Sequence, residues 1–511
     1  MNSPEWLLRS VQSVSKGLKF KRNEVGAINL KLGTKTRPLA AVAPPMAEPA
    51  STLVSTVVAG PLAKNGRSTR ERLKAVLKHK EEALSPRVLR RTLVELQSVV
   101  DSQVSEVEGG RRARNIAIWY ASATPEQRRD AWLLMSEQFA PNAEKVQAAR
   151  DHYEASLGTP EEGQAEIRLR RAFVSPRTRL LQRFSAFPEG MRFLVDLRAE
   201  LLPHLKTEKR LLALDAELEN LFSTWFDVAF LELRSISWDS PASLIEKLIK
   251  YEAVHAIKSW ADVKNRLDSD RRCYGFFHPH LPNEPLIFVE VALVDELACA
   301  ITPLLDELAA ASDLGKATTA IFYSISSTQT GLRGVSFGDS LIKRVVETLR
   351  AEFPRLKVFS TLSPIPGFRA WLVKQAGSMI DQLSDKERQT LGRALGLQPP
   401  TAAVFLAAAD KVVQLDEKSS VRRMLMHCAA SYLGRQFDNG RPLDAVARFH
   451  LSNGARVERL NWAGDMSAKG LKQSYGLMVN YLYDLKRLDK YRGLMAQGKI
   501  PVAPKVEDLY I

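Results

Sequence analysis

The stretch from Ala320 to Phe368, AIFYSISSTQTGLRGVSFGDSLIKRVVETLRAEFPRLKVFSTLSPIPGF, decides the fold of this chain. It begins with a β-branched and aromatic run over 320–326 and continues through a polar, glycine-bearing loop over 327–338. An amphipathic segment follows over 339–353, and a second β-like run over 356–362. This order of strand, glycine loop, helix and strand sets a helix N-terminus at the carboxyl end of a strand, where phosphate-bearing ligands bind.

Outward from this stretch, the sequence divides into three regions. Residues 1–66 have the composition of a disordered basic tail joined to an Ala/Pro-rich linker. Residues 67–264 carry helical signals, such as Ser85-Pro86 and Thr124-Pro125, where a capping oxygen precedes a proline. Residues 265–511 alternate between β-like and helical segments. We therefore expect an α+β protein, mainly helical, in which a helical bundle precedes a mixed α/β domain.

The second half also yields predictions for individual elements. Residues 272–278 and 285–293 are expected to form antiparallel strands, followed by a helix over 295–310. Near the end of the chain, the run 446–451 is β-like, and a strand over 455–462 follows the Asn453-Gly454 turn. Helix is expected from 467 to about 493.

The positive charge is concentrated at one end of the chain. Of the formal charge of +15, residues 1–80 carry +11, since they hold 15 Lys and Arg against 4 Asp and Glu. The other 431 residues therefore carry +4. A nucleic-acid partner is not expected, because that function requires basic residues clustered on a folded face.

The cysteines and the lengths of the apolar runs indicate the cellular compartment. The three cysteines, Cys273, Cys299 and Cys428, are far apart, which indicates a reducing compartment and buried apolar roles. No run is long enough to span a bilayer, so no membrane partner is expected. We expect a cytoplasmic protein, and organellar targeting by the basic tail is the alternative.

The loop Arg333-Gly334-Val335-Ser336-Phe337-Gly338-Asp339 is the first candidate binding site. Its glycines permit close backbone approach to a pyrophosphate at the start of a helix. The spacing matches neither G-x-G-x-x-G nor the P-loop, but it is similar to the acyl-CoA loop of the acetyltransferase fold. From the residues alone, ligand binding and an ordinary strand-to-helix turn remain equally supported.

The same loop contains Gly334-x-Ser336-x-Gly338, the nucleophile-elbow pattern of α/β-hydrolases. Asp410 and then His427 or His450 would complete a triad in the right chain order. An elbow sits directly on the end of its strand, however, and a polar stretch intervenes here. The hydrolase interpretation is therefore the weaker one.

Ser363 and His450 are the remaining candidates for chemistry. Ser363 ends a β-like run and precedes Pro364, so it also suits a simple loop cap. His450 lies in the β-like run Arg448-Phe449-His450-Leu451, where a core histidine is the commoner role. His278 and His280 lack a third residue at metal-ligand spacing, so no metal site is expected.

Several segments together resemble the malonyl-CoA decarboxylase family. They cover roughly residues 180–485 and are MRFLVDLRAELL (191–202), EAVH (252–255), EPL with VAL (284–293), FYSIS (322–326), IKRVV (342–346), LSPIPGF (362–368) and FHL-NGA (449–455). The resemblance implies a helical domain that supports a homotetramer and an acetyltransferase-like (GNAT-like) catalytic domain. It also implies conversion of malonyl-CoA to acetyl-CoA and CO₂ without metal, biotin or another prosthetic group.

The resemblance also assigns roles to residues. It implies that His450 and Ser363 are catalytic, with His450 as the general acid, and that Ser324 lines the same pocket. The implied CoA-phosphate loop consists of Arg333, Gly334, Val335, Ser336, Phe337, Gly338 and Asp339. Some family members have Glu where this chain has Ser336, so the role of that carboxylate does not carry over. The alternatives are a CoA-dependent acyltransferase of the same fold and a thioesterase that uses Ser336.

Overall fold

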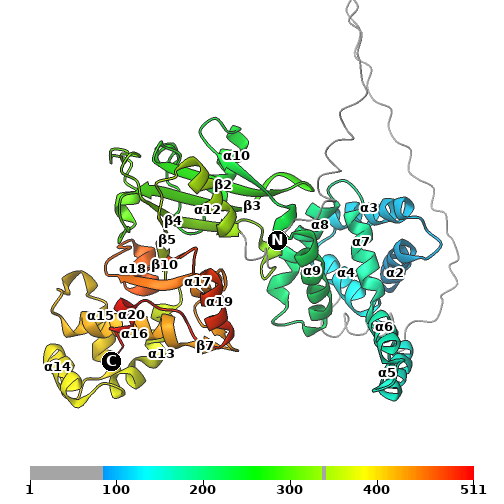
Figure 1. Cartoon of the computed structure of the whole chain (residues 1–511). Helices are drawn as coiled ribbons and strands as arrows, with labels where there is room; N and C mark the ends of the chain where they lie inside the picture. The colour runs from blue at the N-terminus through cyan, green and yellow to red at the C-terminus, as the bar shows by residue number, and fades with distance from the viewer. Residues whose placement is uncertain (1–83, 336–340, 511) are drawn as a thin grey trace, which may run out of the picture. The chain divides into compact units, whose positions relative to one another are not determined.

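A computed structural model describes residues 84–335 and 341–510 of the chain (Figure 1). The predicted tail and linker over 1–66 lie outside these residues. Within the described part, helices come first and a mixed sheet with further helices follows, which confirms the predicted fold class. Among the described helices, none has the length and apolar character needed to cross a membrane.

The first part of the described chain is helical. Its helices are α2 (Pro86–Val100), α3 (Glu106–Ser122), α4 (Pro125–Glu137), α5 (Ala143–Ser156), α6 (Glu162–Phe173), α7 (Pro176–Ser185), α8 (Gly190–Leu201) and α9 (Leu212–Trp225), with 3-10 turns η2 (Leu202–His204) and η3 (Lys209–Leu211). Two predicted starts are confirmed. The Ser85 side chain accepts a hydrogen bond from the Val88 amide, and Thr124 forms a reciprocal capping box with Gln127.

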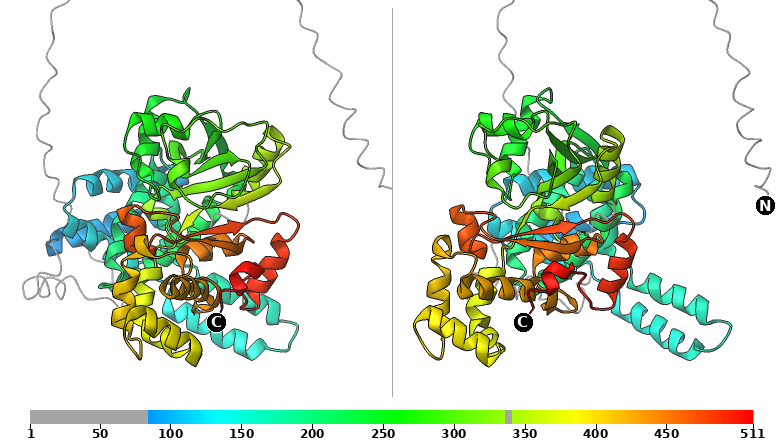
Figure 2. Two further views of the ribbon diagram at one scale, coloured as in Figure 1. Left: turned by 90° about the vertical axis from the view of Figure 1, so that its left-hand side faces the viewer. Right: turned by 60° about the vertical axis from the view of Figure 1, so that its left-hand side comes forward.

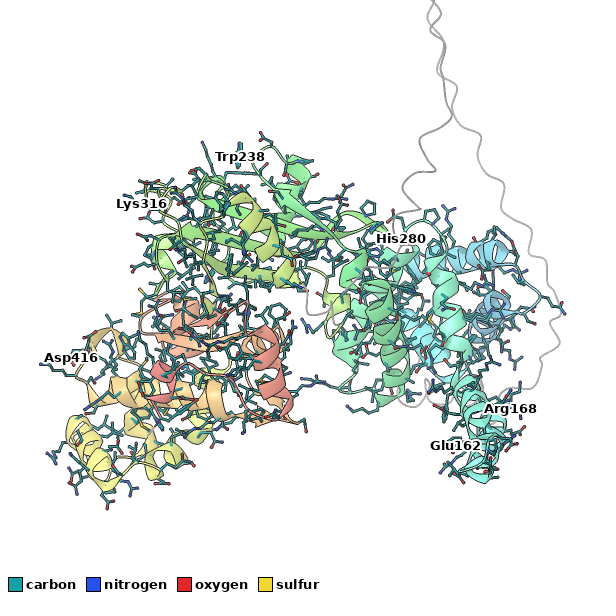
Figure 3. The ribbon with its side chains drawn as sticks, in the orientation of Figure 1. Glu162, Arg168, Trp238, His280, Lys316 and Asp416 are labelled. Atoms are coloured by element: carbon teal, nitrogen blue, oxygen red, sulfur yellow. The ribbon has the colours of Figure 1, made fainter. Side chains whose placement is uncertain are left out.

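Helices α5 and α6 form a hairpin that buries little of its own surface. Of the residues in these two helices, Ser156 and Ala165 are buried. Figure 3 shows side chains such as Glu162 and Arg168 along the outside of the hairpin. With these two buried residues, the hairpin contributes little to the core. Helices of this length are marginal in water without packing, so α5 and α6 depend on each other for stability.

The sheet combines strands from distant parts of the chain. Its strands are β1 (Glu232–Ile236), β2 (Arg271–His278), β3 (Leu281–Val294), β4 (Thr319–Ser327), β5 (Val358–Thr361), β6 (Ser363–Pro364), β9 (Arg456–Asn461) and β10 (Met478–Leu482). The order is β1-β2-β3-β4-β5-β10-β6, and β9 also pairs with β10. The β4–β5 pair is parallel and the other pairs are antiparallel. Figure 2 shows the late strands continuing the sheet that β1 to β5 begin.

Helices cover the sheet and extend the second half. They are α10 (Ala242–Tyr251), α11 (Trp260–Arg266), α12 (Leu341–Glu352), α13 (Phe368–Asp381), α14 (Asp385–Leu395), α15 (Ala402–Ala409), α16 (Ser420–Arg435), α17 (Ala445–Ser452), α18 (Ala468–Ser474), α19 (Leu488–Ala496) and α20 (Pro504–Glu507). Short elements η4 (Val228–Phe230), η5 (Thr302–Leu304), η6 (Thr330–Leu332), η7 (Val412–Gln414), β7 (Phe437–Asp438) and β8 (Arg441–Pro442) connect them. α12 buries Val345, Val346 and Leu349 in the same core as Val291 and Phe322 of the sheet.

Three element predictions are wrong, and each has a physical reason. The helix expected over 295–310 is reduced to the turn η5, because Pro303 removes a backbone donor in the middle of that run. The helix expected from 467 is interrupted by the strand β10, because Tyr475 and Gly476 adopt left-handed backbone angles that end α18. The β-like run 446–451 belongs to the helix α17.

Candidate active site

Two neighbouring strands separate at the position of Ser363. β4 and β5 pair in parallel up to Phe322 and Thr361, and the Leu362 amide still donates to the Phe322 carbonyl at 3.0 Å. The next donor of a parallel ladder would come from Pro364, which has no N–H. The chain instead pairs with β10 as β6. Ser363 therefore stands where β4 loses its partner on that side.

His450 comes to this position on a helix rather than a strand. Asp444 caps α17, and one of its carboxylate oxygens accepts hydrogen bonds from the Val446 and Ala447 amides, each at 2.9 Å. These bonds satisfy free amides of the first turn, which favours helix over the β-like composition of the run. His450 lies in the last turn of α17, buried against the sheet.

A tyrosine–carboxylate contact joins α16 to the start of α17, beside the loop that follows Ser363. The Tyr432 hydroxyl donates to Asp444 at 3.2 Å. A Cβ atom at Gly367 would lie 2.3 Å from the same hydroxyl oxygen, so a larger residue there would displace Tyr432. Glycine in the LSPIPGF segment thus allows the loop and the cap of α17 to pack together.

Ser363 and His450, which are 87 residues apart, meet in this arrangement. The Ser363 Oγ atom lies 3.3 Å from the His450 Nε2 atom and donates a hydrogen bond to Thr361 Oγ1 at 2.8 Å. On the other side of the ring, His450 Nδ1 lies 2.7 Å from the Tyr483 hydroxyl oxygen. Tyr481 stacks on the imidazole, with 4.7 Å between the ring centroids. The result is a hydroxyl–imidazole chain consisting of Thr361, Ser363, His450 and Tyr483.

Burial keeps the members of the hydroxyl–imidazole chain uncharged. His450 is 4% exposed, and desolvation lowers its pKa to about 3, so its imidazole is uncharged at neutral pH. Burial also raises the pKa of the Tyr483 hydroxyl far above its ordinary value. At neutral pH the four side chains therefore exchange hydrogen bonds as neutral donors and acceptors.

Ser324 lies on β4 and makes its hydrogen bonds to a carboxylate. Its hydroxyl donates to Glu252 Oε2 at 2.8 Å and lies 3.3 Å from the Ser326 hydroxyl, which also donates to Glu252. The other Glu252 oxygen accepts the amides of Val254 and His255. Glu252 thus holds both serine hydroxyls in place, and neither of these described serines forms a hydrogen bond with Ser363 or His450.

The glycine loop is described as far as Val335. Gly334 has a φ of +86°, which favours glycine, Arg333 is exposed, and Val335 is buried. The remaining predicted loop residues, Ser336, Phe337, Gly338 and Asp339, lie outside the described residues. The structure therefore describes the entry to this loop.

A buried arginine of α8 fixes the entry to the loop. Arg198, 1% exposed, donates to the carbonyls of Gly331 and Arg333, each at 2.9 Å, and pairs with Asp215 at 2.8 Å. A Cβ atom at Gly331 would lie 1.9 Å from the Val195 carbonyl oxygen, so glycine is required there. The approach to the loop is thereby held against the helical part.

The described residues that would complete a hydrolase triad, Asp410 and either His427 or His450, do not form the hydrogen bonds of a triad with one another. Asp410 forms an ion pair with Arg369 at 2.7 Å. The His427 Nδ1 atom lies 2.9 Å from the Leu509 carbonyl oxygen. His450 contacts Ser363 rather than an aspartate.

Sequence reasoning missed Thr361, Tyr483 and Arg198. Tyr483 follows β10, in a segment expected to be helical, so its position beside His450 could not be foreseen. Thr361 could have been found from its spacing, because residues two apart in a strand point to the same face and Thr361 lies two residues before Ser363. Arg198 lies within the quoted segment MRFLVDLRAELL, but its carbonyl partners are more than 130 residues away.

Two family models match this chain. Residues 139–226 match the malonyl-CoA decarboxylase N-terminal domain, and residues 229–510 match the malonyl-CoA decarboxylase C-terminal domain. The second match covers the whole sheet and every member of the hydroxyl–imidazole chain.

Known relatives agree with these matches. The chain is 39% identical over 344 residues to a mouse protein named malonyl-CoA decarboxylase, mitochondrial, covering 63% of this chain and 68% of that protein. Its goose (Anser anser anser) counterpart is 38% identical over 343 residues, covering 63% and 67%. The crystal structure of malonyl-CoA decarboxylase from Rhodopseudomonas palustris is similar with a TM-score of 0.71 at 38% identity, over 82% of this chain and 99% of that one. The Cupriavidus metallidurans structure gives a TM-score of 0.68 at 42% identity, over 83% and 100%.

Proposed function

Since this chain belongs to the malonyl-CoA decarboxylase family and decarboxylates malonyl-CoA, we propose that His450 is the general acid of the reaction and that Ser363 is its catalytic partner. The observation that carries this proposal is the 3.3 Å contact between Ser363 Oγ and His450 Nε2. The contact lies where β4 and β5 separate, in a buried environment.

The chemistry needs a proton donor at the α-carbon. When the malonyl carboxylate leaves as CO₂, its bonding electrons stay on the α-carbon and delocalise into the thioester as an enolate. His450 then gives its Nε2 proton to the α-carbon, which becomes the methyl group of acetyl-CoA. A neutral imidazole can act as such an electrophile when its site keeps it uncharged. A general acid contributes about 10²–10⁴-fold to the rate.

Tyr483 replaces the proton that His450 gives away. Its hydroxyl is 2.7 Å from Nδ1, so the Tyr483 proton moves to Nδ1 as the Nε2 proton leaves. The imidazole stays neutral. When the product is released, Nε2 takes a proton from water and Nδ1 returns its proton to the Tyr483 oxygen, which restores the starting state. One proton is consumed for each malonyl-CoA, which balances the release of CO₂ from a carboxylate.

The loop from Arg333 to Asp339 is proposed to hold the CoA phosphates. Arg333 is exposed and Gly334 has the positive φ of a close backbone turn. α12 begins at Leu341, soon after the loop, and a helix N-terminus favours an anion. Ser324 is proposed to line the acyl pocket from β4, with its hydroxyl oriented by Glu252.

Self-association and location complete the proposal. The exposed α5–α6 hairpin, with Ile167 and Phe173 each about half exposed, supports assembly into a homotetramer through the helical part. Light scattering of the purified chain would measure the assembly. A cytoplasmic location remains our proposal, and mass spectrometry of the mature N-terminus from the native source tests it against organellar processing.

Incubation of the purified chain with malonyl-CoA alone tests the proposed activity. Chromatography should show acetyl-CoA and CO₂ in equal amounts, with no free CoA. Acyl transfer that appears only when an amine is added would indicate the acyltransferase alternative. Malonate plus free CoA, lost in Ser336→Ala, would indicate the thioesterase alternative. Either of these results would overturn the proposal.

A further inference from the structure

The side chain of Thr361 occupies a central position beside the catalytic pair. It is fully buried on β5, and its Oγ1 atom accepts two hydrogen bonds. One comes from Ser363 Oγ at 2.8 Å, and the other from the backbone amide of Tyr481 at 3.1 Å. The Tyr481 amide can only donate, so it fixes one lone pair of the Thr361 oxygen.

This arrangement determines which nitrogen of His450 carries the proton. A serine hydroxyl has one hydrogen, and the Ser363 hydrogen points at Thr361. The Ser363 oxygen can therefore only accept in its 3.3 Å contact with His450 Nε2, so Nε2 carries the hydrogen. In a neutral imidazole the other nitrogen is then an acceptor, and Nδ1 takes the hydrogen of the Tyr483 hydroxyl at 2.7 Å.

We infer that Thr361 is a positioning residue that keeps His450 in the Nε2–H tautomer. The inference rests on the proposed function, in which the Nε2 proton goes to the α-carbon. If the chain of hydrogen bonds ran the other way, Ser363 would donate to Nε2, and the imidazole would face the substrate without a proton. Thr361 prevents this by offering Ser363 a better-placed acceptor.

Replacing Thr361 with valine removes the acceptor at nearly constant volume. Within the hydroxyl–imidazole chain, His450 Nε2 is then the acceptor left for the Ser363 hydrogen. The ring proton therefore moves to Nδ1, which donates it to the Tyr483 oxygen. In a Ser-His-Asp triad, a wrong imidazole tautomer costs about 10⁴-fold in kcat. We expect Thr361→Val to lower kcat by more than about tenfold and to change KM by less than about twofold, because the Thr361 side chain is fully buried and not exposed to a ligand.

The direct measurement is ¹⁵N NMR of histidine-labelled protein without substrate, which distinguishes protonated from unprotonated ring nitrogens. His450, assigned by its loss in His450→Gln, should show a protonated Nε2 in the wild type and in Thr361→Ser, and a protonated Nδ1 in Thr361→Val. Thr361→Ala provides the same test if the valine variant does not fold. Ser360→Ala is the matched control, because Ser360 is equally buried but its hydroxyl donates to a backbone carbonyl oxygen, that of Tyr481 at 3.1 Å.

Two results would overturn the inference. One is an unchanged His450 tautomer in Thr361→Val or Thr361→Ala, even with reduced activity, since that would make Thr361 structural. The other is an equal loss of kcat in Ser360→Ala. Failure of the proposed function is recognised separately, because it appears as full activity in His450→Ala, while the tautomer is measured without turnover.

Discussion

The sheet buries two polar clusters on opposite faces, and they are built differently. On one face lies the neutral hydroxyl–imidazole chain of Thr361, Ser363, His450 and Tyr483. On the other face is an ionic cluster, in which Arg266 of α11 pairs with Asp262 at 2.7 Å and with Glu290 of β3 at 2.9 Å. The alternation of side chains along β3 places Glu290 on the face opposite Val289 and Val291, which pack in the same core as Phe322. Phe322 is paired with Thr361, so the hydroxyl–imidazole chain lies on the face of these valines.

The two clusters differ in how burial affects the charges of their members. In the ionic cluster two carboxyl groups share one guanidinium, and desolvation raises the pKa of Glu290 to about 8. Glu290 is therefore largely protonated at neutral pH, and the pair of Arg266 with Asp262 resists rearrangement because moving one charge leaves the other unpaired. In the hydroxyl–imidazole chain the side chains are neutral in the resting state, so no ion pair has to be broken before a proton moves. We infer that the first cluster stabilises the fold and that the second carries out chemistry.

Arg266→Met should break the ionic cluster and produce the largest change in stability. It leaves Asp262 as a buried carboxylate without its cation, and removal of one partner of a buried pair costs about 3–5 kcal/mol. Urea unfolding should show this loss, while kcat per folded molecule stays the same. Arg91→Met, which removes an exposed Arg–Glu pair on α2, is the control and should change stability little. A fall in kcat equal to that of a site variant would contradict the assignment.

Tyr483→Phe should weaken the neutral chain by a smaller amount. It removes the hydrogen bond to His450 Nδ1 and keeps the ring that packs near Phe322. One net hydrogen bond is worth about 0.5–1.5 kcal/mol, so kcat should fall up to about tenfold. Steady-state kinetics with malonyl-CoA would measure this. Tyr491→Phe, at the hydroxyl that contacts Arg456, is the matched control. Unchanged kcat in Tyr483→Phe would remove Tyr483 from the proton path.

The neutral chain should show little dependence of rate on pH. Because the pKa of His450 is about 3, its protonation state does not change between pH 6 and 8, and kcat should stay constant there. A tenfold fall in kcat per pH unit above 6.5 would instead indicate an imidazolium acid.

The free energy of unfolding should decrease as the pH falls below about 6.5. The folded pKa values of His450, about 3, and of His255, about 4, lie below the unfolded value of about 6.5. Below pH 6.5 the unfolded chain therefore binds protons that the folded chain does not. Each histidine should lower the free energy of unfolding by up to about 1.4 kcal/mol per pH unit. Urea unfolding at pH 7.5 and 5.5 measures this, and stability that rises on acidification would contradict the buried neutral state.

Local signals predicted much of the fold. The stretch from Ala320 to Phe368 forms β4, α12 and β5 because its strand and helix patterns are each complete within a few turns. Proline and capping residues fixed the starts of α2 and α4 for the same reason. β1 was not predicted, since its five residues acquire strand structure by pairing with β2.

The sequence predicted the Ser363 and His450 pair of the candidate site, but not their partners or their geometry. Ser363 and His450 were singled out, although His450 was assigned to a strand, because the apolar run around it masks the Asp444 cap. Tyr483 and Thr361 gain significance only when β5 and β10 come side by side, and that pairing joins segments about 120 residues apart. Such long-range contacts are not encoded in local periodicity.

We propose above that His450 delivers the proton in malonyl-CoA decarboxylation. The most direct test compares His450→Ala with His427→Ala, which removes another buried histidine that contacts a backbone carbonyl away from the neutral chain. CO₂ release and acetyl-CoA formation should fall about 10²–10⁴-fold in His450→Ala. CoA binding should persist in that variant, and His427→Ala should keep its kcat. Wild-type turnover in His450→Ala, or an equal loss in His427→Ala, would contradict the account.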